Sequence, residues 1–425
     1  MSGKKILRNI GIMLLITFGL IITIEIILRI IFPKNIQNQI RPKSLAYEFN
    51  EDYLVALKPN IERTLTREES GAYTIYWKTN KDSFRGNELK VKPQLRIIVY
   101  GDSSIEARYS KLENTYVQKL ENYLQDSGIK GIETVNGGVV GFGPDQSLIR
   151  LAKEVDIYNP HIIIFSITTH NDFGDIIRNR LFELDSKGNF IETGYKKTVD
   201  PLLIENKDSL DFGLSLQILK VARNIKRYIT RQDAVERKAN DSAESLIQRC
   251  YSAMEREYSV YNQSKPRRFS IFGDCYDLDI ALFPDAESSK TKIKLMDGII
   301  KNAKNIADKK GIGFVVLILP SVIDLTENFD FSYKHLERYP GYRKTNLTNA
   351  VKNICISNRI AFINLFDIFS KNNPEDLFFK GRNDHWNDQG QEIAAKETAL
   401  YIIKEIIPKN RRLTSSFRQG AISNH

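Results

Sequence analysis

Cysteine is scarce in this chain of 425 residues, which has three, at positions 250, 275 and 355. None belongs to a Cys-x-x-Cys pair, so the sequence predicts neither a zinc site nor a disulfide framework. A single bridge between Cys250 and Cys275 stays open outside the cytoplasm. Internal repeats, low-complexity segments and a Gly-x-Gly-x-x-Gly fingerprint are also missing. These absences argue against a metal-stapled, repetitive or dinucleotide-binding protein, and we expect no metal and no cofactor.

The excess of one charge is modest. Lys and Arg number 62 against 52 Asp and Glu, which gives a net charge of +10. The basic residues are scattered among acidic ones and form no arm or stripe. The sequence therefore predicts a solvated surface and no nucleic-acid partner.

A long apolar run occurs once, at residues 10–32 (IGIMLLITFGLIITIEIILRIIF). As a helix it is long enough to cross about 30 Å of hydrocarbon, and only Glu25 and Arg29, four apart on one face, interrupt it. No small-residue cleavage site follows, which favours an uncleaved anchor over a signal peptide. We expect a single-pass protein of the cell membrane. Basic residues flank the run on both sides, and those before it favour a main domain outside the cytoplasm.

Strand-like and helix-like segments alternate through much of the remaining chain. This order predicts a parallel sheet in an α/β fold. The expected strands lie at 96–100, 132–136, 161–167, 314–319 and 361–365, and the expected helices near 113–126, 145–155, 290–309 and 344–357.

Residues 181–288 break the alternation with a charged, largely helical stretch. We interpret it as an insertion or lid over the edge of the sheet. The expected domains are a cytoplasmic tip with the anchor (1–33), a connector with short β elements (34–90), the α/β domain with its insertion (91–408) and a disordered basic tail (409–425).

The first expected strand ends in Gly101-Asp102-Ser103. A serine just beyond the carboxyl end of a parallel strand lies where open α/β sheets bind ligands. Asp and Ser are also frequent helix caps, so this stretch alone leaves both interpretations open.

Three more polar segments follow an expected strand or precede an expected helix, so we expect them at the same edge of the sheet. Residues 136–147 form a glycine-rich turn into a helix. Asn171 follows the strand at 161–167 and either donates to a developing oxyanion or forms an Asx turn, while neighbouring His170 is interpreted as structural. His385 precedes a helix that begins near Asp388, and histidine is the side chain best suited to take a serine proton near neutral pH.

Together and in this order, the four segments resemble the SGNH (GDSL-type) hydrolase superfamily. The matching blocks are Gly101-Asp102-Ser103, Asn136 to Gly141, Thr169-His170-Asn171-Asp172, and Asn383-Asp384-His385-Trp386-Asn387. The resemblance covers roughly 75–180 and 290–405, and it is strongest to a membrane-anchored branch with a His-Trp-Asn final block. It implies a three-layer α/β/α fold with a flavodoxin-like parallel sheet.

The resemblance also implies a role for each residue. Ser103 would be the nucleophile and His385 the base. The oxyanion hole would consist of the backbone N–H groups of Ser103 and Gly141 and the side-chain amide of Asn171. Supporting positions would be Asp102 and Asp172.

Two positions depart from the family pattern. Thr169 stands where the family has glycine, which we expect to narrow the approach to the oxyanion hole. The acid of the triad usually precedes the histidine by two or three residues, but those places hold Asn383 and Arg382. Asp384 bends round to the imidazole, or Asn383 orients it as a neutral amide, or no third member is required.

We therefore expect a membrane-anchored serine esterase or O-acyltransferase that acts on acyl groups, chiefly acetyl, of an envelope carbohydrate or lipid-linked substrate. Water attacks the acyl-enzyme in an esterase and an acceptor hydroxyl does so in a transferase, and the sequence does not separate the two. The rival interpretation is a catalytically inactive envelope-binding or scaffold protein that keeps the fold. The oligomeric state is open.

Overall fold

A computed structural model provides the fold. The chain forms two compact units, of which one (49–199 and 243–425) contains the sheet and every candidate site residue, while the other (1–48 and 200–242) is described at few positions. The residues that the structure describes are 9, 11–13, 16–20, 22–24, 46–66, 74–193, 243–262, 276–327, 329, 335–380 and 383–410.

Several predictions fall partly or wholly outside these residues. The anchor at 10–32 is described only in pieces, and among the pieces present no helix has the length and apolarity needed to span a bilayer. The tail beyond residue 410, the middle of the insertion and Cys275 lie outside the described residues, as does the side chain of Cys250. Cys355 is buried with a free thiol.

The core is a parallel sheet of five strands, which confirms the predicted α/β class. Its order is β11-β10-β7-β5-β6. Numbered along the chain this is 2-1-3-4-5, the flavodoxin-like order. The strands are β5 (Leu95–Gly101), β6 (Ile132–Gly138), β7 (Ile162–Thr168), β10 (Gly313–Leu319) and β11 (Ala361–Asn364).

Strands β5 and β7 are buried along their whole length, as their continuous apolar sequences predict for strands covered on both faces. The chain adds β6 on one side of β5 and β7 on the other. Ligands bind outside the carboxyl ends of the strands at such a switch point. The segment after β5, which begins with Asp102 and Ser103, therefore lies at the favoured position.

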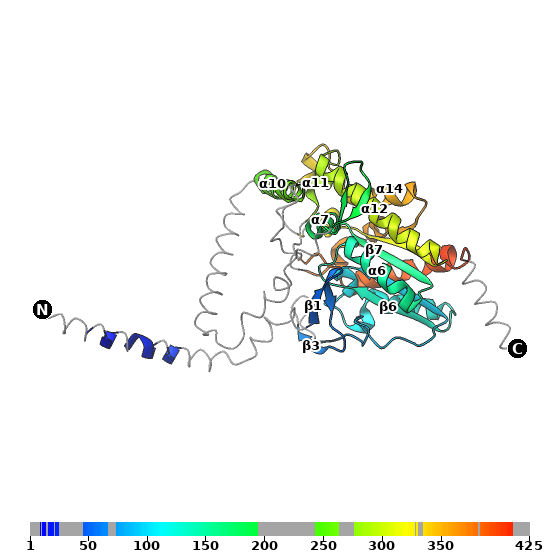
Figure 1. Cartoon of the computed structure of the whole chain (residues 1–425), viewed down its shortest axis with the longest axis horizontal. Helices are drawn as coiled ribbons and strands as arrows, with labels where there is room; N and C mark the ends of the chain where they lie inside the picture. Colours follow the sequence, from blue (N-terminus) through cyan, green and yellow to red (C-terminus); the bar gives the residue numbers. More distant parts are fainter. Residues whose placement is uncertain are drawn as a thin grey trace. The chain divides into compact units, whose positions relative to one another are not determined.

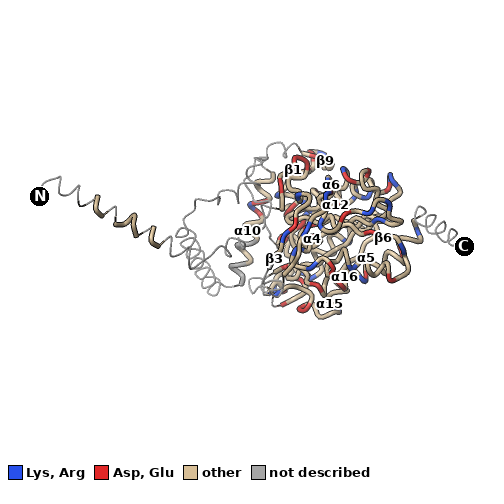
Figure 2. Tube along the Cα trace, turned by 90° about the horizontal axis from the view of Figure 1, so that it is seen from below, with Lys and Arg blue, Asp and Glu red and all other residues tan. Residues whose placement is uncertain are grey.

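Helices cover both faces of the sheet. On one face α5 (Tyr116–Asp126) packs against α16 (Asp388–Tyr401), as Figure 2 shows. On the other, α6 (Pro144–Tyr158) packs against α12 (Glu287–Lys309), which in turn contacts α14 (Asn346–Ser357) (Figure 1). Right-handed crossovers produce this division, because the direction of strand addition reverses after β6. Blue and red segments are interspersed along the trace in Figure 2, so the charges are mixed as predicted.

Smaller elements flank the core. Near the amino terminus, β1 (Tyr47–Asn50) pairs with β2 (Leu54–Leu57), and β3 (Glu62–Thr66) is antiparallel to β4 (Thr74–Lys78). The described parts of the insertion are not purely helical. They comprise the hairpin of β8 (Phe182–Leu184) and β9 (Phe190–Glu192), helix α10 (Ala243–Asn262) and helix α11 (Leu278–Leu282). Helix α10 packs on α7 (Asp172–Asn179), which follows β7.

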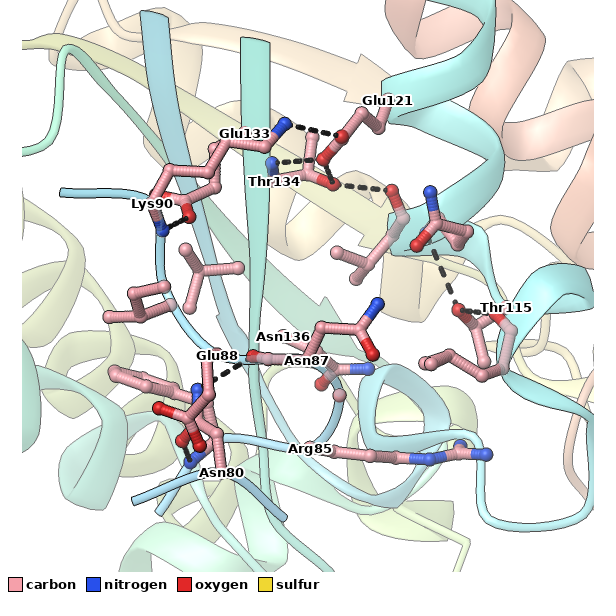
Figure 3. Close-up of a pocket in the computed structure, with 17 residues that line it drawn as sticks. Asn80, Arg85, Asn87, Glu88, Lys90, Thr115, Glu121, Glu133, Thr134 and Asn136 are labelled. Atoms are coloured by element: carbon pink, nitrogen blue, oxygen red, sulfur yellow. Dashed lines mark hydrogen bonds and ion pairs between the residues drawn. The ribbon is translucent and has the colours of Figure 1, made fainter. Parts of the chain in front are cut away.

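A small cavity of about 90 Å³ lies between β6, α5 and the loop at 80–90 (Figure 3). Polar side chains line it, among them Asn80 and Lys90, and Lys90 forms an ion pair of 3.1 Å with Glu121. Its volume suits about three water molecules. Neither Ser103 nor His385 is among its lining residues, so the candidate site lies elsewhere.

The glycines at the end of β6 allow a close helix contact. A Cβ on Gly138 would lie 2.2 Å from the backbone N of Glu106 and 2.6 Å from the carbonyl C of Ile105. Both belong to α4 (Ser103–Glu106), the short helix that follows β5. The glycine-rich block therefore lets the turn that carries Ser103 sit directly against β6.

We predict that Gly138→Ala lowers the free energy of unfolding by about 3 kcal/mol, because backbone atoms cannot move aside as a flexible side chain can. Urea unfolding of the full chain measures this. The control is Gly128→Ala, whose Cβ would meet nothing within 4 Å. It should cost only about 1 kcal/mol for its positive φ. Equal costs for the two variants would contradict the close contact.

Candidate active site

The turn after β5 both caps a helix and presents a hydroxyl. Asp102 is the N-cap of α4, and its Oδ1 accepts a 2.9 Å hydrogen bond from the backbone N–H of Ser104. A Cβ on Gly101 would lie 2.6 Å from Cγ1 of Ile105, so glycine at 101 allows α4 to pack closely against the end of β5. Ser103 is consequently the first residue of α4, at the carboxyl edge of the sheet. The capping interpretation is confirmed for Asp102, and the ligand-binding interpretation of Ser103 stays a prediction.

His385 reaches this hydroxyl from the far end of the sequence. Its Nε2 lies 2.7 Å from Oγ of Ser103. The neighbouring Trp386 is buried, donates from Nε1 to the carbonyl of Ser104 at 2.9 Å and stacks on Tyr116 with ring centroids 5.5 Å apart. The indole thus fastens the histidine segment to the serine turn.

Two oxygen atoms face the other ring nitrogen of His385. Oδ1 of Asn383 accepts hydrogen bonds from the backbone N–H of His385 at 3.1 Å and from its Nδ1 at 2.8 Å. Oδ1 of Asp384 lies 3.0 Å from the same Nδ1 as an ion-pair partner. An amide oxygen only accepts, so Nδ1 carries the hydrogen and Nε2 of the neutral ring has its lone pair toward Ser103. Asn383 and Asp384, the two residues considered for the third member of the triad, therefore both reach the imidazole in the structure.

The charges around His385 set its protonation. Burial alone would lower its pKa, but the carboxylate of Asp384 outweighs this effect and raises the pKa to about 9. For Asp384, burial raises the pKa, yet the opposing charge of His385 holds it below its ordinary value. Asn383 thus orients the ring, while Asp384 stabilises its positive charge.

The three predicted oxyanion donors follow three adjacent strands. The N–H of Ser103 is in the first turn of α4, where helical N–H groups have no intrahelical acceptor. Gly141 has φ +78 in the loop after β6. The N–H groups on either side of it are bound, Val140 to Glu106 Oε2 at 2.8 Å and Phe142 to the carbonyl of Val139 at 3.1 Å. Within the described parts of the chain, no acceptor takes the N–H of Gly141.

Asn171 follows β7 as the N-cap of α7, but its side chain makes no capping bond. Its Nδ2 instead donates to Asp175 Oδ2 at 2.8 Å, so the predicted Asx turn is not formed by this amide. The expectation for Thr169 was wrong: its Oγ1 donates to the carbonyl of Leu319 at 2.9 Å, so the side chain is directed toward the end of β10. His170 is buried and its Nδ1 lies 2.9 Å from Oγ of Ser321.

The two predicted supporting acids shape the turns rather than face the reacting atoms. Oδ2 of Asp172 accepts from the backbone N–H of Thr168 at 2.7 Å, as Asp102 does from Ser104 in the preceding block. Burial raises the pKa of Asp102 to about 6, against the lowering effect of His385. Burial, together with the charge of Asp102, raises the pKa of Asp172 well above its usual range.

Several contributors to the site were not predicted. Glu106 is fully buried, and its Oε2 binds the loop that carries Gly141. The ring of Tyr109 meets the imidazole of His385 edge-on, with centroids 5.1 Å apart. An acid or a tyrosine in a mixed polar stretch gives no sign of burial, so the sequence carried no usable signal for either. In the part of the chain that the structure covers, no three His, Cys, Asp or Glu side chains are grouped to hold a metal ion.

This chain has low similarity to the known proteins with which it was compared. No family model matches the sequence, and no curated protein does. Among solved structures, the lipase/acylhydrolase from Enterococcus faecalis is 11% identical over 72% of this chain and 95% of its own, with a TM-score of 0.35. The acetyl xylan esterase AlAXEase is 12% identical over 73% and 100%, with a TM-score of 0.35. The acetylxylan esterase Axe2 from Geobacillus stearothermophilus is 12% identical over 74% and 95%, with a TM-score of 0.33.

The proposal for a function therefore rests on the geometry of this chain's own residues.

We predict that His385 titrates near pH 9 in the folded chain, above its ordinary value of about 6.5. Because the folded pKa is the higher one, the protonated ring contributes stability that is fully present below about pH 6.5 and is lost as the pH rises through 9. Asp384→Asn removes the largest raising charge, so the pKa of His385 should fall clearly below 9.

NMR titration of the imidazole in the full chain measures this pKa. Asp367→Asn, which changes an exposed acid on α15 (Leu365–Ser370), is the matched control and should leave the pKa in place. A pKa that stays near 9 in Asp384→Asn would contradict the assigned charge pair.

Proposed function

We propose that this chain is a serine hydrolase of the SGNH type, an esterase or O-acyltransferase with an acyl-enzyme at Ser103. The observation that carries the proposal is the 2.7 Å contact between Ser103 Oγ and His385 Nε2. A serine hydroxyl is a weak nucleophile until a neighbouring base accepts its proton. In the neutral ring, whose population grows as the pH rises toward the pKa of about 9, the fixed tautomer leaves the lone pair of Nε2 free to accept that proton.

The proposed reaction has two halves. Nε2 of His385 takes the hydroxyl proton while Oγ of Ser103 attacks the ester carbonyl, and the tetrahedral oxyanion receives hydrogen bonds from Ser103, Gly141 and Asn171. The intermediate collapses, His385 returns the proton to the departing alkoxide, and an acyl-serine remains. Water or an acceptor hydroxyl then gives its proton to His385 as it attacks the acyl group. When this second intermediate collapses, the bond from the acyl carbon to Oγ breaks, His385 returns the proton to Oγ, and free Ser103 is regenerated.

Asn383 and Asp384 together take the role that one carboxylate has in a Ser-His-Asp triad. The amide oxygen keeps Nδ1 protonated in the neutral ring, and the carboxylate 3.0 Å away stabilises the imidazolium that forms during attack. The main argument for an inactive scaffold is that no acid stands two or three residues before His385, where the family has one. Because two oxygens reach Nδ1 in its place, we favour the enzyme.

For the substrate we propose an acyl ester, chiefly acetyl, of an envelope carbohydrate or a lipid-linked glycan. We further propose that residues 10–32 anchor the protein in the cell membrane, with the catalytic domain outside the cytoplasm. The support is the apolar run itself and the similarity of the final block to a membrane-anchored branch of the superfamily.

We predict that Ser103→Ala lowers kcat for a chromogenic acetate ester by at least about 1,000-fold. The matched control is Ser104→Ala, because Ser104 is adjacent in sequence but its hydroxyl, among the residues that the structure describes, makes only a 3.4 Å contact with Thr168 Oγ1. This control should retain most of the activity. Hydrolysis that survives Ser103→Ala, or that is absent from the wild-type chain with every acyl ester offered, would favour the scaffold.

A further inference from the structure

The amide of Asn171 is oriented by an acid one helical turn away. Asp175 accepts from Nδ2 of Asn171 at 2.8 Å, and a carboxylate can only accept. It therefore determines which end of the amide faces it, a choice that packing alone leaves nearly degenerate. An NH₂ group has two hydrogens, so one remains for a ligand.

Arg178 holds this acid in place. Its Nε and Nη2 donate to Asp175 Oδ1 at 3.1 Å and 2.5 Å, and Nη2 also reaches the carbonyl of Asn171 at 3.3 Å. The arginine side chain is 1% exposed. A Cβ at Gly174 would lie 2.6 Å from Nη1, so glycine at this position leaves room for the guanidinium where it lies. Arg178 thus constrains Asn171 at its backbone directly and at its side chain through Asp175.

The insertion supplies the remaining partner. Glu257 of α10 lies 3.3 Å from Nη1 of Arg178. The residues before α11 approach the same turn, because the N–H of Asp277 binds the carbonyl of His170 at 2.8 Å and its Oδ2 accepts from the N–H of Gly174 at 3.1 Å. Burial lowers the pKa of Arg178, but the surrounding carboxylates, Asp175 first, raise it further, so the cation persists.

We propose that Arg178 is a positioning residue that locks Asn171 as an oxyanion donor, and that helix α10 completes the active site by holding Arg178 through Glu257. The inference rests on the proposed function and gives the insertion a role in it. A network that merely stabilised the fold would leave the chemistry of Asn171 unaffected. The two roles differ in whether the effect of a substitution depends on Asn171.

Arg178→Lys tests this dependence, because an ammonium keeps the charge but cannot form the fork that grips Asp175. In the full-length chain we expect kcat for a chromogenic acetate ester to fall about 10-fold with KM unchanged, since the oxyanion forms only after binding. In the Asn171→Ala background the same change should alter kcat by less than about twofold. An equal loss in both backgrounds, or no loss in the wild type, would overturn the inference.

Glu257→Gln decides the matter if Arg178→Lys does not fold, as judged by thermal unfolding. It should lower kcat about threefold in the wild type and leave it unchanged in the Asn171→Ala background. The matched control is Glu255→Gln, an exposed acid two residues away on the same helix, which should change nothing. Equal effects of Glu257→Gln in the two backgrounds would again overturn the inference. An active wild type whose variants show no coupling removes only this inference, whereas an inactive wild type removes the proposed function as well.

Discussion

The rest of the structure depends on one contact, that between Ser103 and His385, residues 282 positions apart. The positions of both side chains depend on neighbouring elements. The serine is set by a strand that ends at a glycine and by a helix that begins at Asp102. The histidine is set by the indole of Trp386, which binds the serine turn, and by helix α16 behind it. The parallel sheet brings these two distant segments to one edge, so the contact is a consequence of the topology as much as of the residues.

Around this contact, buried polar groups form hydrogen bonds with partners that hold them in one orientation. Asn383 and Asp384 separate the orientation of the imidazole from its charge, a division that a single triad carboxylate would not need. Glu106 and Asp175 similarly fix the loop of Gly141 and the amide of Asn171. A buried carboxylate is costly unless it accepts hydrogen bonds, so each acid strongly specifies one local geometry. This preorganisation is what an oxyanion hole requires.

Much of the fold could be predicted from the sequence, because β5, β7 and β10 are mainly apolar and the helices between the strands keep a helical period. The positions of Ser103, His385 and Asn171 could be predicted as well, since each follows a strand or precedes a helix within a known block. The contacts of the insertion could not. Arg178 and Glu257 are 79 residues apart and lie in ordinary charged stretches, and nothing in a linear pattern shows that a charge will be buried. The direction of the Thr169 side chain also depended on β10, a strand about 150 residues away.

The most direct test of the central contact is covalent labelling of the full-length chain by a fluorophosphonate, followed by mass mapping of the adduct. The reagent reacts only with a serine whose proton a neighbouring base accepts. We predict a single adduct on Ser103, formed more slowly as the pH falls below the pKa of His385. A folded chain that stays unlabelled, or an adduct on another residue, would contradict the proposed pairing.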